Sequence, residues 1–151
     1  MADEEKYCQV VDGKLALPYQ YFAGRLGSRF IISLRDKKQI LGVKSKKTGK
    51  VSVPPRAVDH LTFEPLAENM VPVGPAGEIT NFTVVRYNDR HLPRKAPFVL
   101  ALIKLDGADT AMTHIVEGVE PEKVDVGMKV KAVFATQTTN TILDIDHFEP
   151  V

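Results

Sequence analysis

Polar side chains at positions 45, 48, 59 and 62 have the spacing of metal ligands. In the run Ser45-Lys46-Lys47-Thr48-Gly49-Lys50, a serine and a threonine are separated by two residues, as the two cysteines of a zinc knuckle are. Asp59 and Thr62 repeat this spacing, at the place where a complete ribbon would carry its second cysteine pair. The four positions therefore have the layout of a small metal ribbon whose thiolates have all been replaced.

The chemistry of these four side chains does not suit zinc. Zinc is held tightly by deprotonated sulfur or imidazole nitrogen, and hydroxyl groups at pH 7 supply neither. Asp59 together with His60 could hold a metal only weakly. We therefore predict no metal ligands and no bound zinc, and the segment is either a metal-free hairpin or a coincidence that the surrounding sequence must decide.

Residues that often serve in catalysis are scattered along the chain. His114 lies among apolar residues of an expected strand, which favours a hydrogen-bonded barrel residue over a catalytic base. Asp106 and Asp109 bracket a glycine turn, where aspartates usually bond to their own backbone. Cys8 has no histidine near it in the sequence to activate it. No Ser-His-Asp set or phosphate-binding glycine loop is legible, so we predict no catalytic residue.

Composition and charge narrow the class of protein. The 151 residues are 44% hydrophobic and 26% charged, which is typical of a soluble globular protein. The net charge of +1 argues against strong attraction of the whole molecule to nucleic acid or anionic membranes. No apolar run approaches the roughly 20 residues of a membrane span, and the start MADEEK is not a signal peptide. One cysteine excludes an intrachain disulfide, so we expect a cytoplasmic protein.

The residues before the lysine-rich turn predict helical structure. Between positions 19 and 36 the apolar residues recur at steps of three and four, which places them on one helical face. Pro18 suits the first helical position. Gly24 and Gly27 interrupt the pattern and Ser28 could cap a new helix, so one helix and two short helices both remain open. Such a face either packs within its own domain or docks a partner.

The rest of the chain predicts strands. Residues 39–43 and 51–53 flank the turn at Thr48-Gly49-Lys50, and Pro54-Pro55 ends the second strand because proline offers no donor to a ladder. Further strands are expected at residues 79–87, 97–105, 110–116, 126–134 and 141–146, with one helical turn at 121–124. Five such strands with one short helix fit a closed five-stranded barrel of the OB-fold type.

The order of these pieces resembles the zinc-ribbon/OB-fold proteins, once catalogued as a domain of unknown function, which occur beside thiolases and other acyl-CoA enzymes. The resemblance covers nearly the whole chain from Tyr19 onward and depends on the ordered combination of its motifs. The matching segments are Tyr19 to Phe30, Gly42-Val43-Lys44, Lys50-Val51, Val53-Pro54-Pro55-Arg56, Phe82-Thr83-Val84-Val85, Pro97-Phe98, Leu105-Asp106-Gly107-Ala108-Asp109, His114, Gly127-Met128, Val130, Asp144-Ile145 and Phe148-Glu149-Pro150.

The resemblance implies an architecture and a role. The implied fold is mainly β with N-terminal helices, in which a helical docking segment (1–37) precedes a rubredoxin-like ribbon hairpin (38–70) and an OB-fold barrel (71–151). The implied role is that of an accessory subunit in a thiolase-type or related acyl-CoA complex, which helps to bind or channel the acyl-CoA. A thiolase needs a nucleophilic cysteine with histidine partners, so catalysis would come from another chain. This sequence departs from the family at Ser45, Thr48, Asp59 and Thr62, where four cysteines are usual.

Coenzyme A is an anion, so a seat for it should offer lysine or arginine. Positive charge is concentrated on the ribbon (Lys44, Lys46, Lys47, Lys50 and Arg56) and near the first barrel loop (Arg86, Arg90, Arg94 and Lys95). We select Lys46, Lys47, Arg56 and Arg86 as the candidate residues for coenzyme A or acyl-CoA, which we do not expect to be bound tightly. A solvated face remains the alternative for each run, and Lys46 and Lys47 could equally steer an acidic partner surface.

A single-stranded nucleic-acid-binding OB module is the second hypothesis. Such modules combine a basic groove with exposed aromatic residues on which bases stack. The chain has 7% aromatic residues and no tryptophan, and its charge is nearly balanced. The sequence therefore favours the accessory subunit, in a hetero-oligomer with an acyl-CoA enzyme and without a membrane.

Overall fold

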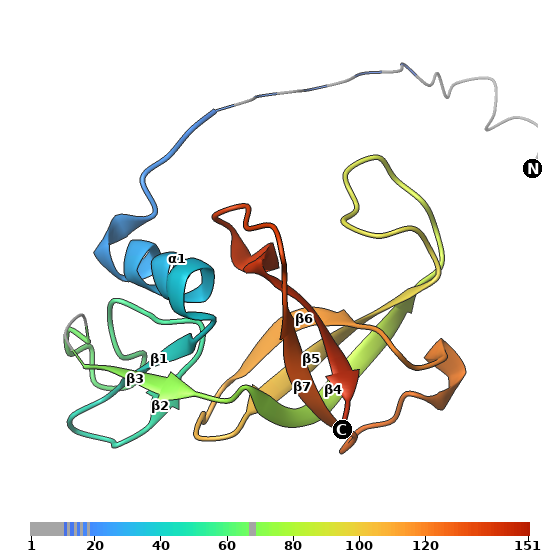
Figure 1. The fold of residues 1–151 in the computed structure, drawn as a ribbon. Helices are drawn as coiled ribbons and strands as arrows, with labels where there is room; N and C mark the ends of the chain where they lie inside the picture. The colour runs from blue at the N-terminus through green and yellow to red at the C-terminus, as the bar shows by residue number, and fades with distance from the viewer. Residues whose placement is uncertain (1–10, 12, 14, 16, 18, 67–68) are drawn as a thin grey trace, which may run out of the picture.

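A computed structural model describes residues 11, 13, 15, 17, 19–66 and 69–151. It contains a small three-stranded sheet covered by a helix, and beside it a closed barrel (Figure 1). Cys8 and the first ten residues of the predicted docking segment lie outside the described residues. Within them, no helix is long and apolar enough to cross a membrane.

One helix, α1 (Gly24–Lys37), precedes the strands. It buries Leu26, Phe30 and Leu34, which follow the predicted helical spacing. The prediction that the helix starts near Tyr19 is wrong, because residues 19–23 are not helical and Gly24 has a left-handed φ of 75° at the boundary. Pro18, the expected first helical residue, lies outside the described residues. The helix ends where Lys38 adopts φ 49° and its N–H bonds to the Ser33 carbonyl.

The sheet under α1 has the strand order β2-β1-β3 and is antiparallel throughout. Its strands are β1 (Ile40–Lys44), β2 (Val51–Ser52) and β3 (Met70–Val73). The first two form the hairpin expected around the lysine-rich turn. The third was not foreseen, because Pro72 lies inside it and proline argues against a ladder. Proline is tolerated there because β3 pairs with β1 alone.

The remaining strands close into a barrel with the order β4-β5-β6-β8-β7, and β7 pairs back onto β4. Its elements are β4 (Ala76–Val85), β5 (Phe98–Leu105), β6 (Ala111–Val116), the 3₁₀ turn η2 (Pro121–Lys123), β7 (Lys129–Phe134), the 3₁₀ turn η3 (Ile142–Asp144) and β8 (Ile145–Pro150). All neighbours are antiparallel except β6 and β8. The predicted closed five-stranded OB-fold barrel is confirmed.

The predicted strand at 141–146 is placed too early. Thr141 accepts a hydrogen bond from the Leu143 N–H (3.2 Å), and Asp144 Oδ1 accepts one from the Thr139 N–H (2.6 Å). These local bonds curl residues 142–144 into η3, so the ladder begins only at Ile145. This turn packs against α1 and so joins the helix to the barrel.

Inside the barrel, Ile79, Ile103, Val130 and Phe148 are fully buried. Gly77 allows β4 and β5 to approach closely, because a Cβ atom there would lie 2.5 Å from the Lys104 carbonyl oxygen. These buried side chains form the core of the barrel.

The turn between β5 and β6 fastens the small sheet to the barrel. Asp109 accepts a hydrogen bond from the Val51 N–H through Oδ2 (2.7 Å) and donates its own N–H to the Val51 carbonyl (2.8 Å). Thr110 Oγ1 accepts from the Val53 N–H (2.8 Å) and donates to the Val53 carbonyl (2.9 Å). The expectation that Asp109 serves its own turn is thereby corrected, since its carboxylate bonds to β2.

Candidate functional site

Two turns of the small sheet have the same backbone construction. In the turn at 45–50, the Ser45 N–H donates to the Lys50 carbonyl (2.9 Å) and the Gly49 N–H to the Ser45 carbonyl (3.0 Å). In the turn at 59–64, the Asp59 N–H donates to the Glu64 carbonyl (3.0 Å) and the Phe63 N–H to the Asp59 carbonyl (2.9 Å). The spacing read from the sequence thus corresponds to a repeated structural unit.

In each turn the first side chain accepts bonds from backbone N–H groups ahead of it. Ser45 Oγ accepts from the Thr48 N–H (3.2 Å). Asp59 Oδ1 accepts from the Leu61 N–H (2.8 Å) and the Thr62 N–H (2.9 Å). Both side chains are buried, Ser45 being 2% and Asp59 6% exposed. A hydroxyl and a carboxylate therefore organise the two turns from inside.

Glu64 links one turn to the other. The Ser45 hydroxyl donates to Glu64 Oε1 (2.6 Å), and the same oxygen accepts from the Lys47 N–H (3.2 Å). The Ser45 hydroxyl lowers the pKa of the Glu64 carboxyl, because the hydrogen bond favours the ionised form. The sequence reasoning missed Glu64, and its position two residues after Thr62 was the only signal that could have indicated it.

The Asp59 carboxylate is held ionised by its hydrogen bonds. The backbone N–H groups of Thr62 and Leu61 lower its pKa to about 2, against the opposing effect of burial, and the Ser45 side chain contributes in the same direction. The charge of the carboxylate is met by these backbone N–H dipoles.

These four corner residues do not fit zinc. Ser45 already donates its proton to Glu64. Thr48 is exposed, and its Oγ1 accepts the Lys50 N–H (3.3 Å). Thr62 Oγ1 is buried without a hydrogen-bond partner among the described residues. Three neutral hydroxyls and one carboxylate are not a zinc donor set, because zinc is held by thiolate, imidazole or several carboxylate ligands.

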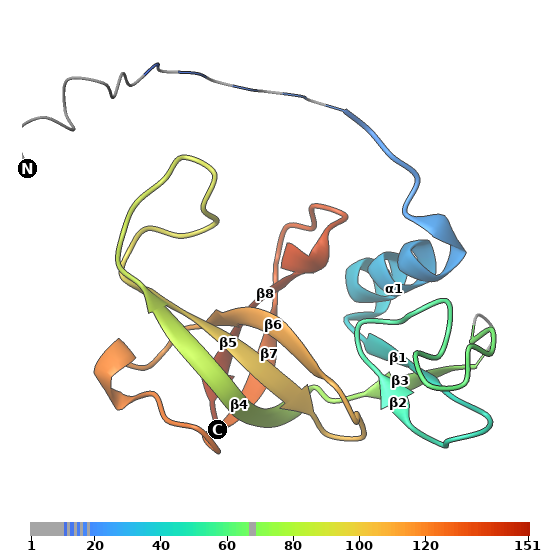
Figure 2. The same ribbon diagram turned by 180° about the vertical axis from the view of Figure 1, so that it is seen from behind.

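The four predicted coenzyme A residues do not share one site. Lys46, Lys47 and Arg56 are exposed on the small sheet's loops. Arg86 follows the far end of β4, whose ten residues span about 33 Å, and it faces Glu122 at 3.5 Å. Figure 2 shows the loop after β4 at the end of the barrel away from the small sheet. The candidates thus divide into a ribbon group and a loop group.

The outer face of β4, β5 and β6 has a shallow hollow of about 320 Å³. Its lining residues are Asn81, Phe82, Thr83, Leu100, Ala101, Leu102 and Thr113. None of these is basic, and Phe82, the one aromatic residue, is half-buried against the core. A basic groove with stacking aromatics, as single-strand binding requires, is absent from this lining.

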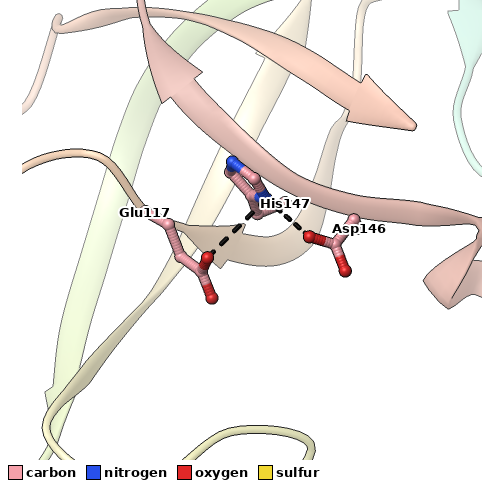
Figure 3. A group of neighbouring side chains, drawn as sticks. All are labelled: Glu117, Asp146 and His147. Atoms are coloured by element: carbon pink, nitrogen blue, oxygen red, sulfur yellow. Dashed lines mark hydrogen bonds and ion pairs between the residues drawn. The ribbon is translucent and has the colours of Figure 1, made fainter. Parts of the chain in front are cut away.

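Glu117, Asp146 and His147 bring three possible metal-binding atoms within 4.8 Å of one another (Figure 3). His147 Nδ1 lies 2.8 Å from Asp146 Oδ2 and 3.7 Å from Glu117 Oε2. Arg94 donates hydrogen bonds to the same two carboxylates. Its Nε donates to Glu117 Oε1, and its Nη2 donates to Asp146 Oδ1 (2.7 Å). The Arg94 guanidinium therefore already pairs with both carboxylates, and we interpret the cluster as an ion-pair network and not a metal centre.

The Arg94 network fixes the long loop that joins β4 to β5. Arg94 lies in that loop, whereas Glu117 follows β6 and Asp146 lies in β8. The ion pairs raise the pKa of Arg94 further, the Glu117 hydrogen bond contributing most. Around this anchor the loop encloses an open hollow of about 670 Å³, with Arg90 and Lys95 on its rim.

His114 is a structural residue, as the sequence indicated. It is 3% exposed, its Nε2 lies 3.4 Å from the Ile142 carbonyl, and its ring meets Phe148 edge-on. Burial lowers its pKa, which favours the neutral ring.

Comparison with known proteins supports the OB-fold assignment of the barrel. Residues 70–135 match the family model described as ChsH2, C-terminal OB-fold domain. A "DUF35 domain-containing scaffold protein" of Methanocaldococcus jannaschii is 27% identical over 101 residues, which cover 67% of this chain and 71% of the relative. The predicted family resemblance is confirmed.

Two solved structures extend the DUF35 resemblance. A DUF35-family protein of unknown function from Sulfolobus solfataricus superposes with a TM-score of 0.59 and 27% identity, covering 73% of this chain and 78% of that one. The structure named "Ltp2-ChsH2(DUF35) aldolase" superposes with a TM-score of 0.63, covering 82% of this chain and 93% of that one. At 16% identity, this second match shows a common fold alone.

Proposed function

We propose that this chain is a non-catalytic scaffold subunit of a thiolase-type acyl-CoA enzyme complex. It contributes a docking surface and contacts to the acyl-CoA, and a partner chain carries the catalytic groups. The name of the Methanocaldococcus relative, a scaffold protein, supports the accessory role. The name of the Ltp2-ChsH2 structure, which joins a DUF35 protein with a second protein in an aldolase, supports a hetero-oligomer.

The observation that carries the proposal is the exposed apolar run before α1. Six large apolar side chains between positions 11 and 22 are each 70–85% exposed: Val11, Leu15, Leu17, Tyr19, Tyr21 and Phe22. Aromatic side chains bury about 150–250 Å² each when covered, so these six together approach the ~800 Å² that each partner contributes to a standard protein interface. A run of this size is expected to be covered by another protein.

The described residues supply no catalytic constellation for carbon–carbon bond chemistry. His114 is buried, which lowers its pKa and favours the neutral ring, and Arg94 pairs with the carboxylate of Glu117. For the acyl-CoA, we propose that Arg86 and the rim of the 86–97 loop receive a phosphate group, while the ribbon group of Lys46, Lys47 and Arg56 remains the second candidate seat.

The experiment is reconstitution with the partner. The tagged chain is expected to co-purify with an acyl-CoA enzyme that mass spectrometry can identify, and neither protein alone should show the full turnover of the mixture. The variant Tyr19→Ser/Tyr21→Ser/Phe22→Ser should weaken association at least tenfold, because it removes the exposed apolar area and leaves the core untouched. Tyr87→Ser, at the opposite end of the barrel and 67% exposed, is the matched control. Turnover by the purified chain alone would refute the proposal.

A further inference from the structure

Phe63 combines two energetic costs. It has a φ of 55°, a left-handed conformation that bulky residues rarely adopt, and its side chain is 79% exposed. The equivalent position of the other turn is Gly49, with a φ of 73°. Both N–H groups make the same bond, to the carbonyl four residues earlier. The turn needs glycine geometry at this position, and a phenylalanine has been placed there without gaining burial.

Two further apolar side chains accompany Phe63. Leu61 is 58% and Val58 46% exposed. The hairpin that bears them is internally bonded, by a bridge between Val58 and Pro65 and by a hydrogen bond from the Leu66 N–H to the Ala57 carbonyl (2.9 Å). These three apolar side chains, here called the Phe63 tip, are therefore presented on a braced hairpin. An anchor that is already ordered loses little conformational entropy on binding.

The surroundings of the Phe63 tip are basic. Lys46 and Lys47 are exposed on the neighbouring turn, which Glu64 joins to this one, and Arg56 is exposed just before the hairpin. Within the described residues 56–66, the two acidic side chains, Asp59 and Glu64, direct their carboxylates to backbone N–H groups and the Ser45 hydroxyl. The tip thus offers an apolar centre beside cationic side chains.

We propose that Phe63 is the anchor of a second docking surface, and that it enters an apolar pocket with an acidic rim on the enzyme subunit. This inference rests on the proposed function and gives it a specific contact. Aromatic anchors in pockets carry most of the binding energy at protein interfaces, and flanking charges speed the encounter. The basic residues Lys46 and Lys47 face the acidic rim.

The test is Phe63→Gly in the full chain, measured against the separately purified enzyme subunit that co-purifies with it. Glycine accepts the φ of 55° without strain, so the melting temperature should stay the same or rise. The dissociation constant should increase at least tenfold, mainly through faster dissociation. Lys46→Glu/Lys47→Glu should slow association and reduce its salt dependence. Val126→Ala, at an exposed apolar residue before β7 that is 57% exposed, should change neither quantity.

The outcomes separate this inference from the function it rests on. Unchanged affinity in Phe63→Gly, with wild type binding well, would overturn the Phe63 contact and leave the scaffold role standing. A lower melting temperature together with lost binding would show that Phe63 holds the hairpin itself, and would also overturn it. A wild-type dimer that Phe63→Gly converts to monomer would assign the tip to a second copy of this chain. Failure of the wild-type chain to bind would overturn both proposals.

Discussion

Ser45, Asp59 and Glu64 organise and connect the two turns by hydrogen bonding. Ser45 joins the two turns through a short bond to Glu64 (2.6 Å), and the Lys47 N–H bonds to the same carboxylate oxygen (3.2 Å). Buried acceptors need such partners, because an unsatisfied one costs about 1–3 kcal/mol. We therefore expect the contact between the two turns to depend on these side-chain hydrogen bonds.

Ser45→Ala should destabilise the protein by about 1–3 kcal/mol, because Glu64 loses its hydroxyl donor and the Thr48 N–H loses its acceptor. Urea unfolding measures the change. Thr48→Ala is the matched control, since Thr48 is exposed and should cost less than half as much. Equal costs for the two variants would show that the buried link is not what holds the turns.

Because of Asp59, the stability of the folded chain should decrease at low pH. Its pKa is about 2 in the folded chain, below the usual value of about 3.9 in an unfolded one. The ionised carboxylate therefore contributes stability that is fully present above about pH 4 and is lost as the pH falls towards 2. The gap in melting temperature between wild type and Asp59→Asn should be widest at pH 6 and narrow by pH 2.5. A constant gap would contradict the assignment.

For single residues, the sequence indicated which positions organise the turns, but it did not indicate which hydrogen bonds join one turn to the other. The two-residue gaps identified Ser45 and Asp59 because spacing along the chain determines what one turn can bring together. Glu64 was missed because its role depends on the second turn lying against the first, a tertiary contact that local spacing does not contain. Phe63 was missed for a similar reason, since a left-handed φ is normally indicated by glycine.

Among the elements, the β5–β6 turn has a larger role than its sequence suggested. Its aspartate and threonine supply acceptors to β2, so the small sheet and the barrel share a hydrogen-bonded seam. Asp109→Ala should lower stability by about 1 kcal/mol and increase amide exchange at Val51, whose N–H loses its acceptor, more than at Val53, whose N–H keeps Thr110; hydrogen-exchange mass spectrometry can follow both. Asp106→Ala, in the same turn, should leave both amides protected, and exchange that rises equally in both variants would argue against the seam.

The two turns should accept zinc if their thiolates are restored. Ser45→Cys/Thr48→Cys/Asp59→Cys/Thr62→Cys is expected to bind one equivalent of zinc, because the repeated backbone construction already sets the four corners. Elemental analysis after dialysis measures it, with Lys46→Cys/Thr48→Cys/His60→Cys/Thr62→Cys as the control that spoils the spacing. Less than half an equivalent in the first variant would show that the two turns are not arranged as a ligand cage.

Strand and helix prediction succeeded where periodicity was strong and failed at boundaries. Four barrel strands were placed within a few residues by their β-branched and apolar patterns. The fifth was started too early because Asp144 and Thr141 favour local bonds over a ladder. β3 was missed because edge placement, which permits Pro72, is a property of the assembled sheet. The start of α1 was misjudged because residues 19–23 continue the apolar pattern, although their side chains are exposed.

On the scale of the whole molecule, the two parts present different chemistry. The small-sheet region bears the exposed apolar side chains of Val58, Leu61 and Phe63, whereas the far end of the barrel bears a basic loop held by Arg94 (Figure 1). This separation suits a subunit that grips an enzyme at one end and meets an anionic ligand at the other. The fold class could be predicted from the sequence. The separation of Arg86 from the small sheet could not, because it depends on the length and direction of β4 in the folded barrel.

The loop group should bind the anionic end of coenzyme A independently of the partner contact. In the reconstituted complex, Arg86→Ala should raise the KM for acyl-CoA severalfold at unchanged kcat, because a phosphate contact remote from the reacting carbon acts equally in ground and transition states. Steady-state kinetics measure it, and Lys46→Ala tests the alternative ribbon seat in the same assay. An unchanged KM in both variants would contradict the proposal that this chain contacts coenzyme A.

The central claim is tested most directly by acyl-CoA turnover with the enzyme subunit alone, this chain alone, and the two combined, after the chain has been treated with a chelator. We predict activity above the enzyme-alone level only in the mixture, at the same rate with treated and untreated chain. Turnover by this chain alone, no gain on mixing, or a gain that vanishes with the chelator would contradict a metal-free, non-catalytic scaffold.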